Sequence, residues 1–150
     1  MSKIPEGYTS ITPYITFDDT AGAIELYKKA LGAEVIMSMP APDGKIMHAE
    51  IKVGNARIMV GSPCPENGGK SAKTLGGSPV SFYVYVEDVQ AAFDKAKGEG
   101  MTEKKAPEDM FWGDRMGTVS DPFGIDWTIA EHVRDVSPEE IEEAMKKMAC

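Results

Sequence analysis

The sequence predicts an α+β fold of two tandem βαβββ modules that form a half-barrel cavity, plus a C-terminal helix. The first observation is an internal repeat with an offset of 69 residues, so that 11–19 (ITPYITFDD) lies over 80–88 (VSFYVYVED). Both segments are rich in β-forming residues, carry a tyrosine at the same place and end in an acidic pair. Each then runs directly into a helical pattern, and three strand-like segments follow each helix.

Apolar spacing and capping residues mark the helix of each module. The residues that form the expected apolar stripes are Ala23, Ile24, Tyr27 and Leu31 in the first module and Val89, Ala92, Phe93 and Ala96 in the second. Asp19 (or Thr20) and Asp88 are the expected N-caps, because their side chains accept the free amide hydrogens of a first turn. The glycines expected to end the helices are Gly32, and either Gly98 or Gly100.

Compact turns separate the three strands expected after each helix. The expected strands are 34–39, 45–53 and 56–62 in the first module, and 101–106, 115–120 and 125–130 in the second. The turn sequences PDG at 42–44, GN at 54–55 and PFG at 122–124 suit tight connections.

We expect a single domain, with module 1 at about 8–66 and module 2 at about 79–132. The Gly-rich segment 67–78 between them should be a flexible connector. A C-terminal helix is expected at 137–148, because 137–140 (SPEE) is a capping box with proline at the first helical position. Its apolar face, formed by Ile141, Ala144, Met145 and Met148, must pack on its own sheet or on a second subunit.

Composition limits the possible partners. The 150 residues are 42% hydrophobic and carry 24 acidic against 16 basic side chains, for a net charge of −8. Nucleic-acid binding is not expected, because affinity for phosphate depends on clustered Lys and Arg. No membrane span is expected either, because one needs about 20 consecutive apolar residues. Without a visible signal peptide, a cytoplasmic protein with small-molecule or protein partners is the expectation.

Several motifs resemble one family when they are taken together. Segment 17–19 (FDD) leads into 25–32 (ELYKKALG), and 121–124 (DPFG) precedes the last strand. With the order of elements, these motifs resemble the glyoxalase/bleomycin resistance/dioxygenase superfamily, also called the vicinal oxygen chelate (VOC) superfamily. Segments 111–115 (FWGDR) and 132–137 (HVRDVS) resemble its PhnB-like branch, often labelled demethylubiquinone methyltransferase-like. The resemblance covers about residues 8 to 148.

The resemblance also identifies positions where metal-dependent members carry His, Glu or Gln ligands. In this sequence these positions are occupied by Thr12, Met59, Ser81 and Thr128, none of which is a usual ligand in such a site. We therefore expect no metal and no cofactor. Methyltransferase activity is not expected, because the chain lacks a nucleotide-binding Gly-rich strand–helix junction.

His48 and Glu50 alternate along one strand and should face the same side. A metal site there would need a third ligand, for which Asp126, Glu131 and His132 are the candidates. The alternative, which we prefer, is a polar pair in a cavity wall or on the outer face.

Trp112 and Arg115 form the second candidate cluster. Trp112 offers a flat apolar surface with one donor, and the planar fork of Arg115 suits a carboxylate or phosphate. The alternative is a structural latch in which Arg115 forms a salt bridge. The complete set of expected ligand-binding residues is Tyr14, His48, Glu50, Met59, Trp112 and Arg115.

Three functions remain open. The first is a metal-independent protein that binds a small organic, possibly anionic, ligand in its cavity. The second is a VOC-superfamily enzyme (lyase, isomerase or dioxygenase-like) with a non-standard site, in which His48, Glu50 or Asp114 transfers protons. The third is a non-catalytic structural or interaction module. In each case we expect a homodimer, because the C-terminal apolar face needs cover.

Overall fold

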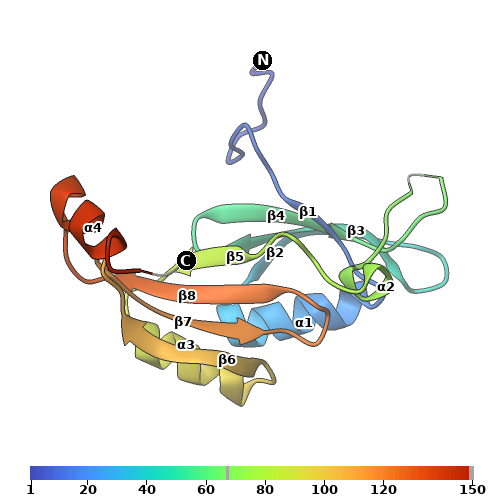
Figure 1. The fold of residues 1–150 in the computed structure, drawn as a ribbon. Helices are drawn as coiled ribbons and strands as arrows, with labels where there is room; N and C mark the ends of the chain where they lie inside the picture. Colours follow the sequence, from blue (N-terminus) through green and yellow to red (C-terminus); the bar gives the residue numbers. More distant parts are fainter. Residues whose placement is uncertain (67, 149–150) are drawn as a thin grey trace.

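The computed structural model describes residues 1–66 and 68–148, and it confirms the predicted fold class (Figure 1). The first sheet, sheet 1, has the strand order β1-β4-β3-β2, and the second, sheet 2, has the equivalent order β5-β8-β7-β6. The strands of sheet 1 are β1 (Tyr14–Thr16), β2 (Glu34–Pro40), β3 (Ile46–Val53) and β4 (Ala56–Gly61). Those of sheet 2 are β5 (Phe82–Tyr85), β6 (Thr102–Asp109), β7 (Asp114–Ser120) and β8 (Asp126–His132).

The repeat in the sequence is also a repeat in strand register. Tyr14 of β1 lies opposite Met59 of β4, and Tyr83 of β5 lies opposite Thr128 of β8. Both strand pairs are parallel, and the offset of 69 residues relates one to the other. The two sheets therefore have the same strand order and the same register, so residues 69 positions apart can be compared directly.

The helices begin where the sequence predicts. In α1 (Thr20–Leu31) the Asp19 carboxylate accepts the amide hydrogen of Gly22, and in α3 (Val89–Gly98) Asp88 caps the first turn in the same way. Gly32 ends α1 in the left-handed conformation, with a φ of 67°. Gly98 is the last residue of α3, and the chain turns at Gly100.

Two segments differ from the expectation. Strand β1 has only three residues, because Pro13 has no amide hydrogen and its carbonyl alone bonds to β4. The described part of the connector expected to be flexible contains a short helix, α2 (Ala72–Leu75). Its cap, Ser71, is buried and donates to Asp18 at 2.8 Å, which fastens the connector to the end of β1.

An aromatic cluster joins the two modules in the core. Tyr27 of α1 packs edge-on against Trp127 of β8, with ring centroids 5.1 Å apart, and Phe17 does the same with Phe123 at 5.6 Å. The Tyr27 hydroxyl donates to the buried carboxylate of Asp121 at 2.5 Å. The modules thus share one core in addition to the contact between their helices.

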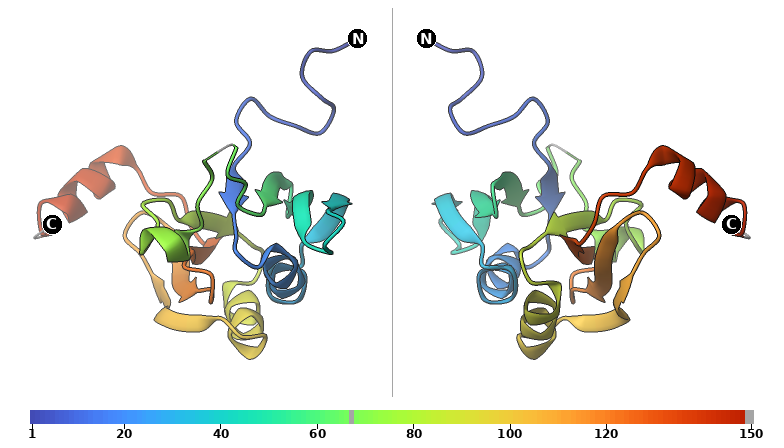
Figure 2. Two further views of the ribbon diagram at one scale, coloured as in Figure 1. Left: turned by 90° about the vertical axis from the view of Figure 1, so that its right-hand side faces the viewer. Right: turned by 90° about the vertical axis from the view of Figure 1, so that its left-hand side faces the viewer.

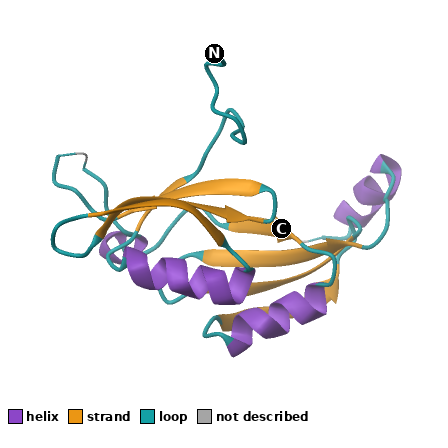
Figure 3. Cartoon of the chain, turned by 180° about the vertical axis from the view of Figure 1, so that it is seen from behind, coloured by secondary structure: helices purple, strands orange, loops and turns teal. Residues whose placement is uncertain are grey.

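The helices leave one face of each sheet uncovered. Helices α1 and α3 lie side by side and cover the same side of the molecule (Figure 3). The open faces of the two sheets therefore point outward and do not look at each other (Figure 2). Helix α4 (Pro138–Met145) projects from the end of sheet 2, and none of its residues, all of which are described, is buried. Within the described chain no helix is long and apolar enough to cross a membrane.

Candidate functional site

Four of the six predicted ligand-binding residues gather on the open face of sheet 1. Alternation along β3 buries Ala49, Ile51 and Val53 against α1, so His48 and Glu50 point the other way. The Tyr14 hydroxyl lies 3.2 Å from Nδ1 of His48, and Nε2 of His48 lies 3.8 Å from Glu50. Met59 stands between Tyr14 and Glu50 in the strand register. Alternation in the sequence predicted that His48 and Glu50 face the same side, and the strand register adds Tyr14 and Met59 to them.

Gly61 makes the contact between Tyr14 and His48 possible. A Cβ atom at Gly61 would lie 2.5 Å from the Tyr14 hydroxyl and 2.7 Å from the carbonyl oxygen of Met47. Without that atom, the tyrosine ring crosses β4 and reaches β3. In sheet 2, Tyr83 occupies the equivalent register position, and its hydroxyl lies 3.2 Å from the sulfur of Met116.

Two residues of this face were missed from the sequence. The Arg57 guanidinium lies over the ring of Tyr8, 4.7 Å from its centroid. The buried hydroxyl of Tyr8 forms no hydrogen bond of normal geometry among the described residues, although the side chains of Glu50 and Arg57 are close enough to interact with it. The nearby Glu50 carboxylate raises the pKa of this phenol. Tyr8 lies in the N-terminal segment outside the repeat, so no periodic signal pointed to it.

A second polar cluster occupies the open face of sheet 2, around Asp114. This carboxylate is 3% exposed and accepts hydrogen bonds from Tyr83 and Tyr85, both at 2.8 Å. Its other oxygen lies 2.9 Å from Nδ1 of His132, and Nε2 of His132 lies 2.8 Å from Asp135. We define Tyr83, Tyr85 and Asp114 as the tyrosine–carboxylate cluster.

The hydrogen bonds of this cluster explain its shifted pKa values. Burial alone would raise the pKa of Asp114, but the bonds from His132, Tyr83 and Tyr85 together lower it. Burial, followed by the bond to Asp114, raises the pKa of Tyr83 to about 12, although Trp112 acts in the opposite direction. Hydrogen bonds to Asp135 and then Asp114 raise the pKa of His132. Asp114 is therefore an anion, and both phenols are neutral, at physiological pH.

The remaining two predicted residues lie apart from the first four. Trp112, in the turn between β6 and β7, is close enough to Tyr83 to affect its pKa. Arg115, Gly117 and Val119 are two residues apart along β7, so they face the same side of the strand. Because Val119 is buried in the core, this is the helix-covered side of sheet 2. The Arg115 guanidinium pairs with Asp109 at 3.3 Å across β6 and β7. A role of these residues in ligand binding stays a prediction.

The strand register also shows what stands at the expected metal positions. Tyr14 is paired with Met59, and Tyr83 with Thr128, while Thr12 and Ser81 precede the strands. The expected positions thus hold three alcohols, at Thr12, Ser81 and Thr128, and the thioether of Met59, all of them poor ligands for the divalent ions of such enzymes. In the part of the chain that is described, no group of three or more His, Cys, Asp or Glu is placed to hold a metal. The residues present therefore do not fit the metal of this fold.

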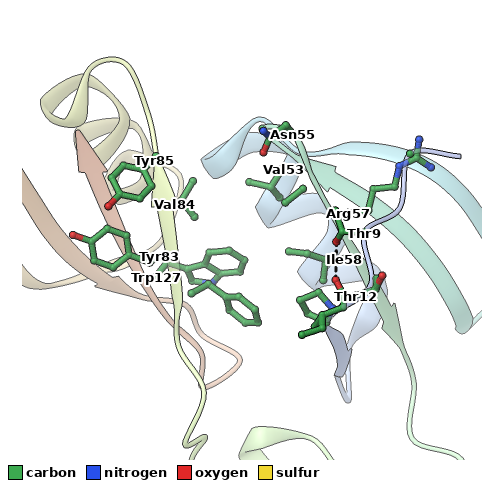
Figure 4. Close-up of a pocket in the computed structure, with 16 residues that line it drawn as sticks. Thr9, Thr12, Val53, Asn55, Arg57, Ile58, Tyr83, Val84, Tyr85 and Trp127 are labelled. Atoms are coloured by element: carbon green, nitrogen blue, oxygen red, sulfur yellow. Dashed lines mark hydrogen bonds between the residues drawn. The ribbon is translucent and has the colours of Figure 1, made fainter. Parts of the chain in front are cut away.

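A cleft of about 540 Å³ lies between β5 of sheet 2 and the β3–β4 hairpin of sheet 1 (Figure 4). Val84 and Trp127 face Val53 and Ile58 across it, so its inner walls are apolar. The rings of Tyr83 and Tyr85 point away from the cleft, toward the open face of sheet 2. Arg57, Tyr83 and Tyr85 also line the cleft, so it adjoins both polar clusters.

Comparisons with known proteins agree with this architecture. Residues 9–129 match the family model of the Glyoxalase/Bleomycin resistance protein/Dioxygenase superfamily. An uncharacterized protein of Mycobacterium bovis is 41% identical over 139 residues, which cover 91% of this chain and 91% of that protein. The crystal structure of an Arabidopsis thaliana gene product, 26% identical, superposes with a TM-score of 0.68 over 83% of this chain and 99% of that one.

A second similar structure is that of a PhnB protein from Bacillus cereus, described as a putative 3-demethylubiquinone-9 3-methyltransferase. It is 16% identical, with a TM-score of 0.61 over 82% of this chain and 99% of that one, and it shows the shared fold. The chain belongs to the glyoxalase/bleomycin resistance protein/dioxygenase superfamily.

Proposed function

We propose that this protein binds a small organic anion without a metal, on the open face of sheet 1. The observation that carries the proposal is the Arg57 guanidinium on this face, which lies over the Tyr8 ring and beside a buried Tyr8 hydroxyl that forms no hydrogen bond of normal geometry among the described residues. Buried polar groups in folded proteins nearly always have a partner, so such a hydroxyl suits a bound ligand or an ordered water.

The surroundings favour a ligand with one anionic group and an apolar body. Arg57 supplies a cation with a fork of donors. Tyr14 and Met59 supply an aromatic ring and a flexible thioether against which an apolar body can pack. His48 and Glu50 complete the polar wall. We favour Arg57 over Arg115 as the anion contact, because only Arg57 lies on this face.

We propose that two copies of the chain complete the cavity as a homodimer. The open faces of one chain point outward, so a cavity walled by both needs the sheet 2 face of a second copy. Trp112 and the tyrosine–carboxylate cluster of one subunit would then oppose Tyr14 and His48 of the other. A cytoplasmic location is part of the same proposal.

A titration with 1-naphthoate tests the function. This probe joins a carboxylate to an apolar ring system, and 1-naphthamide is its neutral counterpart. We expect naphthoate to bind in the presence of a chelator, and Arg57→Gln to weaken binding at least about tenfold, equivalent to about 1.4 kcal/mol. Arg115→Gln is the matched control and should leave the affinity within about twofold.

Isothermal titration calorimetry gives the result for each variant. Equal affinity for naphthoate and naphthamide would mean that the site does not recognise the negative charge, which would contradict the proposed anion site. A loss of affinity in Arg115→Gln and not in Arg57→Gln would mean that the ligand contacts Arg115 on sheet 2 and not Arg57 on sheet 1. Binding that disappears with chelator and returns with a divalent ion would refute metal independence.

An enzyme is the second candidate, favoured by the hydrogen-bonded chain from Asp135 through His132 to Asp114 and Tyr83. Such a chain can hold or pass a proton at the Tyr83 oxygen.

A further inference from the structure

We infer that the tyrosine–carboxylate cluster on the open face of sheet 2 is a binding site for an organic ammonium ion. The site is distinct from the anion contact proposed for sheet 1 and does not depend on it. Its components are two exposed aromatic rings above one buried carboxylate, and each component excludes some ligands.

The phenolic protons exclude anions from this site. Tyr83 and Tyr85 each have one hydroxyl proton, and both are directed at the same Asp114 oxygen at 2.8 Å. A ligand that reaches these hydroxyls meets only oxygen lone pairs, since a neutral phenol has a single donor. A carboxylate or phosphate would therefore find no donor from the phenols and would be repelled by Asp114.

The rings supply the surface that an alkylated cation prefers. Tyr83 and Tyr85 have ring centroids 5.2 Å apart and planes inclined by 50°, and they are 44% and 61% exposed. A cation over the face of a tyrosine is attracted by the negative ring quadrupole. The hydrogen bonds to an ionised carboxylate increase the electron density of both phenols, which strengthens this attraction.

The nearby charges leave the cluster negative. Asp114 contributes one negative charge, and the positive charge of a protonated His132 is offset by Asp135 at 2.8 Å. Arg115 is on the opposite side of the sheet, and Arg134 is paired with Glu140 at 3.2 Å. The chain as a whole carries −8, so its long-range field also favours a cation.

Tetramethylammonium is the probe that tests this inference, with tert-butanol as a neutral molecule of similar size. Both are titrated into the full chain at constant ionic strength, and the ring signals of the tyrosines are followed by NMR. We expect tetramethylammonium to shift the Tyr83 and Tyr85 signals with a millimolar Kd, and tert-butanol to bind at least about fivefold more weakly.

Variants assign the site. Tyr85→Leu removes the more exposed ring and should weaken binding at least about fivefold, as should Asp114→Asn, which removes the charge. Asp126→Asn removes a carboxylate that is paired with Lys104 at the far end of β8 and is the matched control, with an expected change below about twofold. If Asp114→Asn does not fold, as judged by circular dichroism, Tyr85→Leu and tert-butanol decide the result.

Three outcomes would overturn the inference: no shift of the two tyrosine signals, equal binding of tetramethylammonium and tert-butanol, or an equal loss in Asp126→Asn and Tyr85→Leu. A failure of naphthoate to bind would not contradict the inferred ammonium site, because naphthoate tests the anion contact on sheet 1.

Discussion

Asp121 is the single residue that ties the two modules most directly. It is 6% exposed, and its carboxylate accepts hydrogen bonds from the Tyr27 hydroxyl, the Trp127 indole and the amides of Phe123 and Ile125. Two of these donors shape the turn before β8, one belongs to β8 itself, and one comes from α1 of the other module. Local turn geometry and module packing therefore depend on the same oxygens.

Replacing Asp121 with alanine should lower the free energy of unfolding by about 3 kcal/mol or more. The substitution leaves several buried donors without an acceptor, and each such group costs about 1–3 kcal/mol. Urea denaturation measures the change. Glu103→Ala is the control, because its salt bridge to Lys97 is largely exposed and should contribute less than about 1 kcal/mol. A loss below about 1 kcal/mol in the Asp121 variant would contradict this account.

At this scale, alternation predicted some of the candidate site and missed the rest. The pairing of His48 with Glu50 follows from their spacing on one strand. The same rule, applied from the buried Val119, assigns Arg115 to the helix-covered side, although its chemistry had suggested a ligand contact. The contact between Arg57 and Tyr8 depends on where the N-terminal segment folds back, and no spacing rule gives that.

The segment after β8 is an element held by very few contacts. The amides of Val133 and Arg134 both donate to the carbonyl of Gly113. Gly113 has a φ of 100°, and a side chain there would collide with the backbone of Arg134. His132 adds its two carboxylate partners, one on β7 and one within the segment itself.

This attachment should weaken as pH rises. Both His132 nitrogens face carboxylates, which requires a proton on each nitrogen. The pKa of His132 is raised above its ordinary value of 6.5. Its contribution to stability is therefore fully present below about pH 6.5 and is lost as pH increases through the higher folded-state value.

Hydrogen exchange of the Val133 and Arg134 amides measures this effect. We expect their protection to fall across that pH window, after correction for the intrinsic pH dependence of exchange, and to become independent of pH in His132→Gln. His48→Gln should keep the pH dependence, and since the chain has two histidines, the assignment is unambiguous. A folded-state pKa of His132 at or below 6.5 would refute the prediction.

Helix and strand types were predictable because each depends on local spacing and caps. The limits of β1 and the helix α2 were not, since both depend on distant partners. Pro13 reduces β1 to the three residues that can pair fully with β4. Ser71 fastens α2 to Asp18, which lies far away in sequence. Glycine content alone suggested flexibility in that segment.

For the whole molecule, we expect a homodimer at micromolar concentration. One face of α4 presents Ile141 and Met145, and Met145 is 58% exposed. A stable interface should bury more than about 1,000 Å² in total. Met145→Glu should shift light scattering toward the monomer without loss of circular dichroism, whereas Glu143→Gln on the same helix should not. A wild-type monomer would contradict both the dimer and the shared cavity.

The repeated register has an evolutionary consequence. An internal duplication would explain why each sheet has a tyrosine at the same register position, Tyr14 in sheet 1 and Tyr83 in sheet 2. What has diverged is the residue reached, an imidazole at His48 and a thioether at Met116. The open faces of the two sheets thus have equivalent geometry and different chemistry within one chain. Selection can alter the chemistry of one half while the ancestral geometry of the other is preserved.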